Sequence, residues 1–211
     1  MGIPVMILGE SGSGKTTSLR NFEPNEIGVI GVVGKPLPFK SKIGVYRLDK
    51  AAKEKRTNRY DLLKNVLLSS KVPSVAIDDS QYLMAFDSFD RAKERGYDKF
   101  TNMAVSFKEL IDFVINDLPD NKIVYFLHHI EIADDGHYTV KTIGKMLDSQ
   151  LTVEGMFTIV LLCTADKQSH KFITQNDGTS TAKSPIDMLP LEMDNDLKAV
   201  DKAIRKYYEM R

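Results

Sequence analysis

The chain has 211 residues, of which 42% are hydrophobic and 27% are charged, as in a globular protein with a buried core. Its 29 basic and 29 acidic side chains cancel, which argues against binding of nucleic acid through bulk charge alone and leaves room only for a local basic patch. The single cysteine, Cys163, excludes a disulfide framework and a thiolate zinc cluster. Because it lies in an apolar run, we expect a buried strand thiol.

The start of the chain lacks a charged segment followed by a long apolar one, so no signal peptide is predicted. No apolar run reaches the roughly 18 residues that a membrane-spanning helix needs. We therefore expect a cytosolic protein that does not contact a membrane.

Short apolar runs alternate with longer amphipathic segments, which predicts an α/β fold. Strands are expected at 3–8, 27–33, 43–48, 74–77, 122–127, 156–162 and 171–174. Helices are expected at 14–21, 58–70, 81–95, 102–116 and 197–208. A hairpin is predicted where 130–133 and 137–140 flank the turn at 134–136.

Two segments are expected to be irregular. The first, 34–38, holds two prolines, and the second, 175–194, lacks periodicity and should form a long loop or arm. No internal repeat or linker marks a second domain, so we expect one domain over residues 1–211.

Residues 9–16, directly after the first expected strand, read Gly-Glu-Ser-Gly-Ser-Gly-Lys-Thr and match the phosphate-loop pattern G-x-x-x-x-G-K-[ST]. Its glycines let backbone N–H groups surround a phosphate chain, and the following helix adds its positive end. Lys15 should reach the β- and γ-phosphates of a nucleotide, and the Thr16 hydroxyl should bind Mg²⁺. The residues predicted to hold the nucleotide are Gly9, Glu10, Ser11, Gly12, Ser13, Gly14, Lys15, Thr16 and Thr17.

The strand at 74–77 is followed by two carboxylates. Asp78 is the predicted residue of the Mg²⁺ shell. Asp79 occupies the place where many AAA+-type ATPases carry a glutamate that activates the attacking water. Because aspartate is one methylene shorter, capping of the next helix is an alternative role for Asp79. Glu10 and Glu131 are the other carboxylates considered as the base.

His128 and His129 end the strand at 122–127, at the edge of a parallel sheet where ligands bind. Because adjacent strand residues point to opposite faces, one histidine should sense the γ-phosphate and the other should pack or cap. Lys141 and Lys145 follow the hairpin. They are either solvated charges or a finger that reaches the γ-phosphate of a neighbouring subunit.

Nine basic residues lie between 35 and 59, against two acidic ones, which is the asymmetry that a track for a nucleic-acid backbone requires. A solvated basic loop is the alternative. Phe39 and Tyr46 could stack on bases. The candidate DNA contacts are Lys40, Lys42 and Arg47 and, in a second basic and aromatic cluster, Arg91, Lys93, Arg95 and Lys99.

Seven motifs together resemble a family of phage-encoded ATP-binding proteins that is grouped with the phage single-strand annealing proteins. They follow one another over nearly the whole chain, at 9–17, 34–39, 96–100, 128–129, 141–147, 154–157 and 182–185. The resemblance implies a RecA-like or AAA-type P-loop NTPase core with a mostly parallel central sheet flanked by helices. It also implies ATP and Mg²⁺ as cofactors, with ATP at a subunit interface.

The same resemblance implies a homo-oligomer, as a ring or a filament, that acts on single-stranded DNA in phage recombination and replication in the host cytoplasm. A single-strand DNA-binding protein is the further partner. The resemblance favours the finger role of Lys141 and Lys145 and makes Lys183 a second candidate near the nucleotide. RecA-type enzymes usually carry a glutamate after the second strand, but this chain has Lys35 there. Either Asp79 serves as the base or hydrolysis is slow.

Three functions are therefore compared: a DNA-dependent ATPase, a nucleotide-gated DNA-binding protein with little turnover, and a small-molecule kinase. A kinase usually closes an arginine-rich lid over the phosphates. The late half of the chain has only Arg205 and Arg211, which disfavours the kinase.

Overall fold

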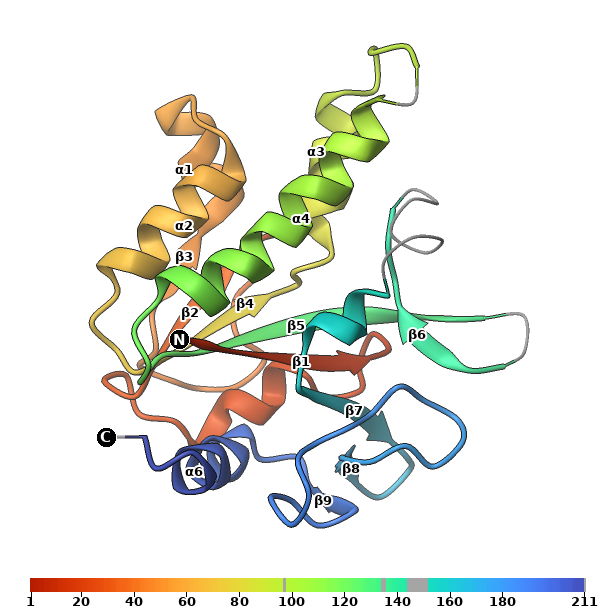
Figure 1. Ribbon diagram of the computed structural model, residues 1–211. Helices are drawn as coiled ribbons and strands as arrows, with labels where there is room; N and C mark the ends of the chain where they lie inside the picture. Colours follow the sequence, from red (N-terminus) through yellow and green to blue (C-terminus); the bar gives the residue numbers. More distant parts are fainter. Residues whose placement is uncertain (97, 134–135, 144–151, 211) are drawn as a thin grey trace.

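The computed structural model describes residues 1–96, 98–133, 136–143 and 152–210 (Figure 1). Through these residues runs a nine-stranded sheet in the order β3-β2-β4-β5-β1-β7-β8-β9, with β6 paired to β5. The strands are β1 (Ile3–Gly9), β2 (Ile27–Gly31), β3 (Val45–Arg47), β4 (Ser74–Asp78), β5 (Ile123–Ile132), β6 (Tyr138–Val140), β7 (Ile159–Ala165), β8 (His170–Ile173) and β9 (Glu192–Asp194). From β3 to β7 every pairing along this order is parallel, and β8 and β9 continue the sheet antiparallel.

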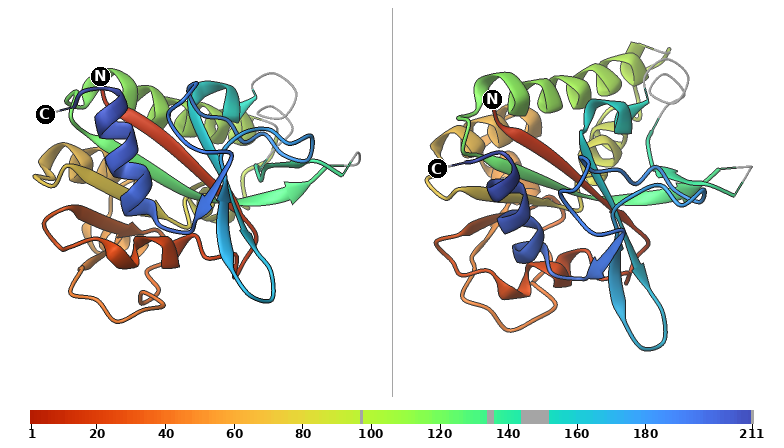
Figure 2. Two further views of the ribbon diagram at one scale, coloured as in Figure 1. Left: turned by 90° about the horizontal axis from the view of Figure 1, so that it is seen from below. Right: turned by 60° about the horizontal axis from the view of Figure 1, so that its bottom comes forward.

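Helices cover both faces of the sheet, with α1 to α4 on one face and η1 and α6 on the other (Figure 1). Their bounds are α1 (Leu48–Lys55), α2 (Arg59–Ser69), α3 (Tyr82–Asp90), α4 (Asp98–Asp117), α6 (Leu197–Tyr207) and the short 3-10 helices η1 (Thr16–Asn21) and η2 (Val153–Met156). The two termini lie close together, as both views of Figure 2 show. No helix in the described ranges is long and apolar enough to cross a bilayer.

Alternating side chains of the central strands build two cores. In β1, Met6 and Leu8 pack under α1 to α4, whereas Val5 and Ile7 pack toward η1 and α6. All four side chains are fully buried. A parallel sheet covered on both faces explains why β1 reads as a continuous hydrophobic run. The chain is therefore an α/β protein with a mostly parallel central sheet flanked by helices, as its sequence predicts.

The predicted hairpin is confirmed, because Ile130 pairs antiparallel with Val140. Gly136 has a φ of 84°, which suits a glycine in its turn. The sequence did not predict α1, however. This helix buries only Leu48 and Ala52, so its apolar signal is sparse, although alanine, lysine and glutamate favour a helix.

Further elements differ from the sequence prediction. Helix α3 ends at Asp90 and not at residue 95, and α4 begins at Asp98 and not at residue 102. The helix expected at 14–21 is the 3-10 helix η1, which begins at Thr16. Its threonine and serine residues compete for backbone hydrogen bonds, and Ser18 Oγ donates to the Lys15 carbonyl. Strand β7 begins three residues later than expected, because η2 takes up the start of that apolar run. The arm expected at 175–194 ends in β9 and is tied to β7 where Lys183 bridges Val160.

Candidate functional site

The phosphate loop follows β1 at the carboxyl edge of the sheet. Lys15 folds back into it, and its Nζ donates to the carbonyls of Gly9 at 2.7 Å and Glu10 at 2.8 Å. The residue is only 7% exposed, and this burial lowers the pKa of the Lys15 ammonium. The ammonium thus lies within the loop, where it would meet a bound phosphate.

Glycine is required at both ends of the loop. A Cβ on Gly9 would lie 2.4 Å from Ser13 Oγ and 2.7 Å from the Cys163 carbonyl oxygen. Gly14 has a φ of 103°, and a Cβ there would lie 2.9 Å from His170 Nδ1. The loop therefore closes tightly on itself and on the strands beside it.

Cys163 and His170 hold the loop from behind. The Cys163 thiol and His170 Nδ1 both donate to the Ser13 carbonyl, at 3.1 Å and 2.8 Å. Asn195 in turn donates to Cys163 Sγ at 3.0 Å. Burial raises the pKa of Cys163 to about 11, so the predicted unreactive strand thiol is confirmed as a buried group. Sequence reasoning did not connect these residues to the loop.

Ser13 offers a test of whether the loop fits a polyphosphate. Its hydroxyl oxygen is buried and has no hydrogen-bond partner among the residues that the structure describes. A buried polar atom without a partner is costly, and a phosphate oxygen is a suitable acceptor for a hydroxyl. The unpartnered hydroxyl therefore fits a loop that completes its hydrogen bonds with a ligand.

Thr16 and Asp78 join the loop to β4. Thr16 Oγ1 donates to Asp78 Oδ1 at 2.7 Å. The bond links the loop after β1 to the end of β4, two strands between which β5 lies in the sheet. Burial raises the pKa of Asp78, and the bond from Thr16 opposes this rise. A hydroxyl and a carboxylate oxygen are ligands that Mg²⁺ accepts while keeping several waters. The described residues form no cluster of three or more metal-binding side chains, but a phosphate-loop Mg²⁺ needs only this pair with water and phosphate oxygens.

Asp79 lies beside Asp78 with a φ of 60°, an uncommon conformation for a residue other than glycine. Its Oδ2 is 2.8 Å from Lys35 Nζ, and its Oδ1 is 3.4 Å from His129 Nε2. Burial acts to raise the pKa of Asp79, but the hydrogen bonds from His129 and Lys35 outweigh it and lower this pKa. The capping alternative for Asp79 is wrong, because α3 begins at Tyr82 after Gln81 without a side-chain cap and both Asp79 oxygens contact other side chains, those of Lys35 and His129.

His128 packs in the interior, whereas His129 reaches the site. His128 is fully buried, and its Nε2–H donates to the Lys141 carbonyl at 2.8 Å, which leaves Nδ1 to accept from Ser80 Oγ at 2.9 Å. Burial lowers its pKa to about 4, so the ring is neutral. Of the two catalytic candidates, His128 is therefore a packing residue, and His129 lies beside Asp79.

Of the two candidate finger lysines, Lys141 lies directly beside His129. The Lys141 backbone N–H donates to the His129 carbonyl at 3.0 Å, and its side chain is exposed. Lys145 lies outside the described residues. Lys183 pairs with Val160, which is level with Met6 and well before the carboxyl end of β1. That position separates Lys183 from the phosphate loop.

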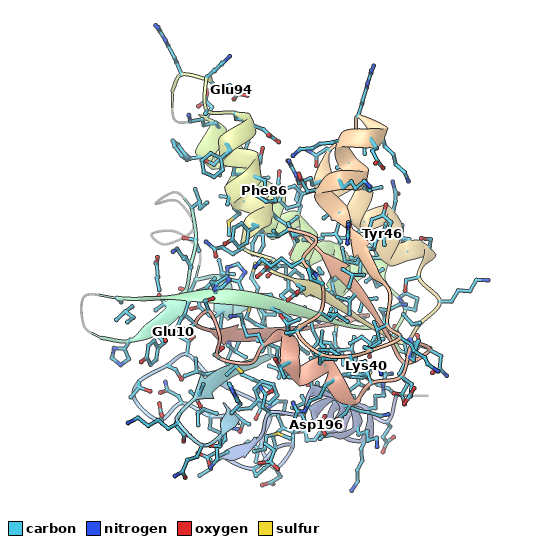
Figure 3. All side chains as sticks on the ribbon, turned by 180° about the vertical axis from the view of Figure 1, so that it is seen from behind. Glu10, Lys40, Tyr46, Phe86, Glu94 and Asp196 are labelled. Atoms are coloured by element: carbon cyan, nitrogen blue, oxygen red, sulfur yellow. The ribbon has the colours of Figure 1, made fainter. Side chains whose placement is uncertain are left out.

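The two candidate DNA clusters lie apart, as the labels of Lys40 and Glu94 show in Figure 3. Lys40, Lys42 and Arg47 are exposed around the loop between β2 and β3. In the other cluster Lys93 and Arg95 are exposed, but Arg91 pairs with Glu94 at 2.8 Å and Lys99 donates to the Glu94 carbonyl. Phe39 and Tyr46 are half-buried and pack against the core, which limits their use in stacking.

A cavity of about 240 Å³ opens beside the loop. Its lining comes from the loop itself, the hairpin and the end of β7: Glu10, Ser11, Gly12, Ser13, Ile130, Tyr138, Leu162, Cys163, Thr164 and Ala165. A space of this size next to the loop can take part of a ligand whose phosphates lie in the loop.

No protein-family model matches the chain, and no curated protein matches its sequence. The carboxyl edge nevertheless gathers a buried ammonium, a hydroxyl bonded to a carboxylate, and a second carboxylate that contacts an ammonium and an imidazole. Such a set can bind a polyphosphate with a divalent cation and place a carboxylate beside its end.

Proposed function

We propose that this protein is a P-loop NTPase with a RecA-like or AAA-type core that binds ATP with Mg²⁺ and hydrolyses it in response to single-stranded DNA. The observation that carries the proposal is the 2.7 Å hydrogen bond from Thr16 to Asp78, next to the buried Lys15. It joins the glycine-rich loop to an acid at the end of a separate strand, which is the pairing that a phosphate loop needs for its cation.

The order of strands supports the same core. Strand β5 lies between the phosphate-loop strand β1 and the acid-bearing strand β4, as in RecA-like and AAA-type proteins. The carboxyl end of β5 carries His129, which contacts Asp79. A polar residue between loop and acid is well placed to respond to the γ-phosphate.

In the proposed reaction each residue has one task. Lys15 exchanges the carbonyls of Gly9 and Glu10 for the β- and γ-phosphates, and the exchange keeps its ammonium hydrogen-bonded. Thr16 and Asp78 would hold the water shell of Mg²⁺, and the bound cation would neutralise charge on the phosphates. Asp79 orients the attacking water.

Single-stranded DNA is proposed to lie along Lys40, Lys42 and Arg47, whose exposed charges suit a phosphate backbone. Lys141 would reach the site of a neighbouring subunit in a homo-oligomer, from a backbone that is anchored beside His129. With these partners the protein would act as a phage-type annealing or recombination ATPase, alongside a single-strand DNA-binding protein.

A nucleotide-gated DNA-binding protein with little turnover is the second candidate. It is favoured by Asp79, whose carboxylate is engaged by Lys35 and His129 and is therefore not free to activate water. The kinase loses further support. Arg205 bonds to Asp201 at 2.6 Å at the opposite edge of the sheet, and Arg211 lies outside the described residues.

ATP turnover measured with and without single-stranded DNA tests these functions. Stimulation by DNA supports the ATPase, and phosphate transfer to a small molecule supports the kinase. DNA binding that depends on nucleotide, without turnover, supports the gated binding protein. A wild-type protein that binds no nucleotide would contradict the proposal.

A further inference from the structure

Lys35 reaches the candidate site through a turn that follows β2. The Val32 N–H donates to the Asp78 carbonyl at 3.1 Å, so the pairing with β4 continues past the end of β2. Gly34 then turns the chain with a φ of 79°, and a Cβ there would lie 3.2 Å from the Arg47 side chain. This turn places Lys35 over the end of β4, where its ammonium meets Asp79.

The Lys35 ammonium is held by exchangeable contacts. Its side chain is 58% exposed. Its ammonium pairs with Asp79 at 2.8 Å and lies 5.9 Å from the centre of the Tyr82 ring. The hydrogen bond to Asp79 raises the pKa of Lys35, so the group stays cationic. A half-exposed pair of this kind has a small net strength and can be replaced by a stronger anion.

Lys35 shares an electrostatic environment with the phosphate loop. Asp79, which pairs with Lys35, directly follows Asp78, and Asp78 accepts the hydrogen bond from Thr16, the neighbour of Lys15 in the loop. Two ammonium groups thus face two carboxylates around the end of β4. The γ-phosphate that Lys15 is proposed to bind would bring further negative charge next to Lys35.

We propose that Lys35 is a γ-phosphate ligand that leaves Asp79 when a nucleoside triphosphate binds, and that it thereby distinguishes a triphosphate from a diphosphate. The proposal rests on the proposed function. No covalent bond changes: the ammonium exchanges a carboxylate oxygen for a γ-phosphate oxygen. A diphosphate offers no oxygen at that place, so the pair with Asp79 persists. Release of Asp79 from Lys35 also makes this carboxylate available to water only when a triphosphate is bound.

Equilibrium binding of Mg²⁺-ADP and of a non-hydrolysable Mg²⁺-ATP analogue to the full chain tests this role. We expect the wild type to prefer the triphosphate by about tenfold or more, since a charge-assisted hydrogen bond is at stake. Lys35→Met should lower that preference by about fivefold, leave the part due to Lys15, and leave ADP affinity unchanged. Lys71→Met, which removes an exposed lysine between α2 and β4, should keep the wild-type ratio.

A second variant should change the affinity for the triphosphate in the opposite direction. Asp79→Asn weakens the pair that Lys35 must leave, so affinity for the triphosphate analogue should rise by about threefold while ADP affinity stays the same. A wild-type ratio in Lys35→Met, or an equal loss for both nucleotides, would overturn the role of Lys35 but leave the proposed function standing. A wild type that binds neither nucleotide would overturn both.

Discussion

The two ends of β4 both carry buried charge, but they hold it differently. At the amino end, Asp201 of α6 accepts hydrogen bonds from Ser74 Oγ, from Tyr125 OH at 2.8 Å and from Arg205 Nε at 2.6 Å. Arg205 also donates to the carbonyl of Pro73 at 3.1 Å. Every charge in this network is matched by groups of the chain itself, and the network ties α6 to the sheet.

The carboxyl end of β4 is held by weaker or replaceable contacts. Lys15 bonds to carbonyls of its own loop, Ser13 Oγ has no partner in the described part of the chain, and Asp79 has a positive φ. Buried polar groups that lack firm partners destabilise a fold, and a ligand bound in the loop would supply the partners that these groups lack. The comparison separates a network whose charges are matched within the chain from one whose groups are left for the proposed ligand.

The largest expected effect is on stability at the amino end. Asp201→Asn should lower the free energy of unfolding by about 3–5 kcal/mol, because it leaves Arg205 without its buried counter-charge. Asp78→Asn should change it by less than about 1 kcal/mol, because burial already disfavours that carboxylate. Urea denaturation of both variants gives the comparison. Equal losses would break the distinction between the two ends.

Removal of the loop ammonium should affect binding and spare the fold. Lys15→Ala should weaken nucleotide binding by about 100-fold or more, as loss of a buried charged partner does. Its free energy of unfolding should not fall, since the ammonium is desolvated in the folded state. Calorimetric titration with ATP measures the first effect. Lys198→Ala, which removes a half-buried pair with Glu26, is the matched control and should bind ATP as the wild type does.

His128 should make stability depend on pH. Burial lowers its folded pKa to about 4, below its unfolded value of about 6.5. The unfolded chain therefore takes up a proton first as the pH falls, and stability that is complete above pH 6.5 is lost toward pH 4. Between pH 7 and pH 5 the loss from this group should be about 2 kcal/mol. Denaturation of His128→Gln should show a flatter profile, and an unchanged profile would contradict the neutral buried ring.

The smallest expected effect concerns the lysine at the base of the proposed finger. Lys141→Ala should leave ATP affinity and the thermal midpoint unchanged, because the side chain is exposed. Turnover of the assembled protein on single-stranded DNA should fall by about tenfold. Steady-state ATPase assays on DNA check this, and unchanged turnover would rule out the finger.

The sequence predicts those residues of the candidate site that directly follow a predicted strand. The phosphate loop directly follows an apolar strand, and Asp78 ends another, so both positions follow from local pattern. The split between His128 and His129 follows from the alternation of side chains along a strand, although the pattern could not say which one is buried.

The missed contacts join residues that are distant in sequence. Ser13 meets Cys163 and His170, which follow 150 and 157 residues later. Only the order of the strands brings them together, and no local pattern encodes that order. The sequence shows Lys35 as one of nine basic residues between 35 and 59, but it does not show that Lys35 pairs with Asp79.

Thr16 and Asp78 are proposed to form the cation-binding half of a nucleotide site. Titration of the protein with a fluorescent ATP analogue, with and without Mg²⁺, tests it most directly. We predict that Mg²⁺ raises the affinity of the wild type by about tenfold or more and leaves the affinity of Asp78→Asn nearly unchanged. Equal Mg²⁺ dependence in the two proteins, or no binding by the wild type, would contradict the claim.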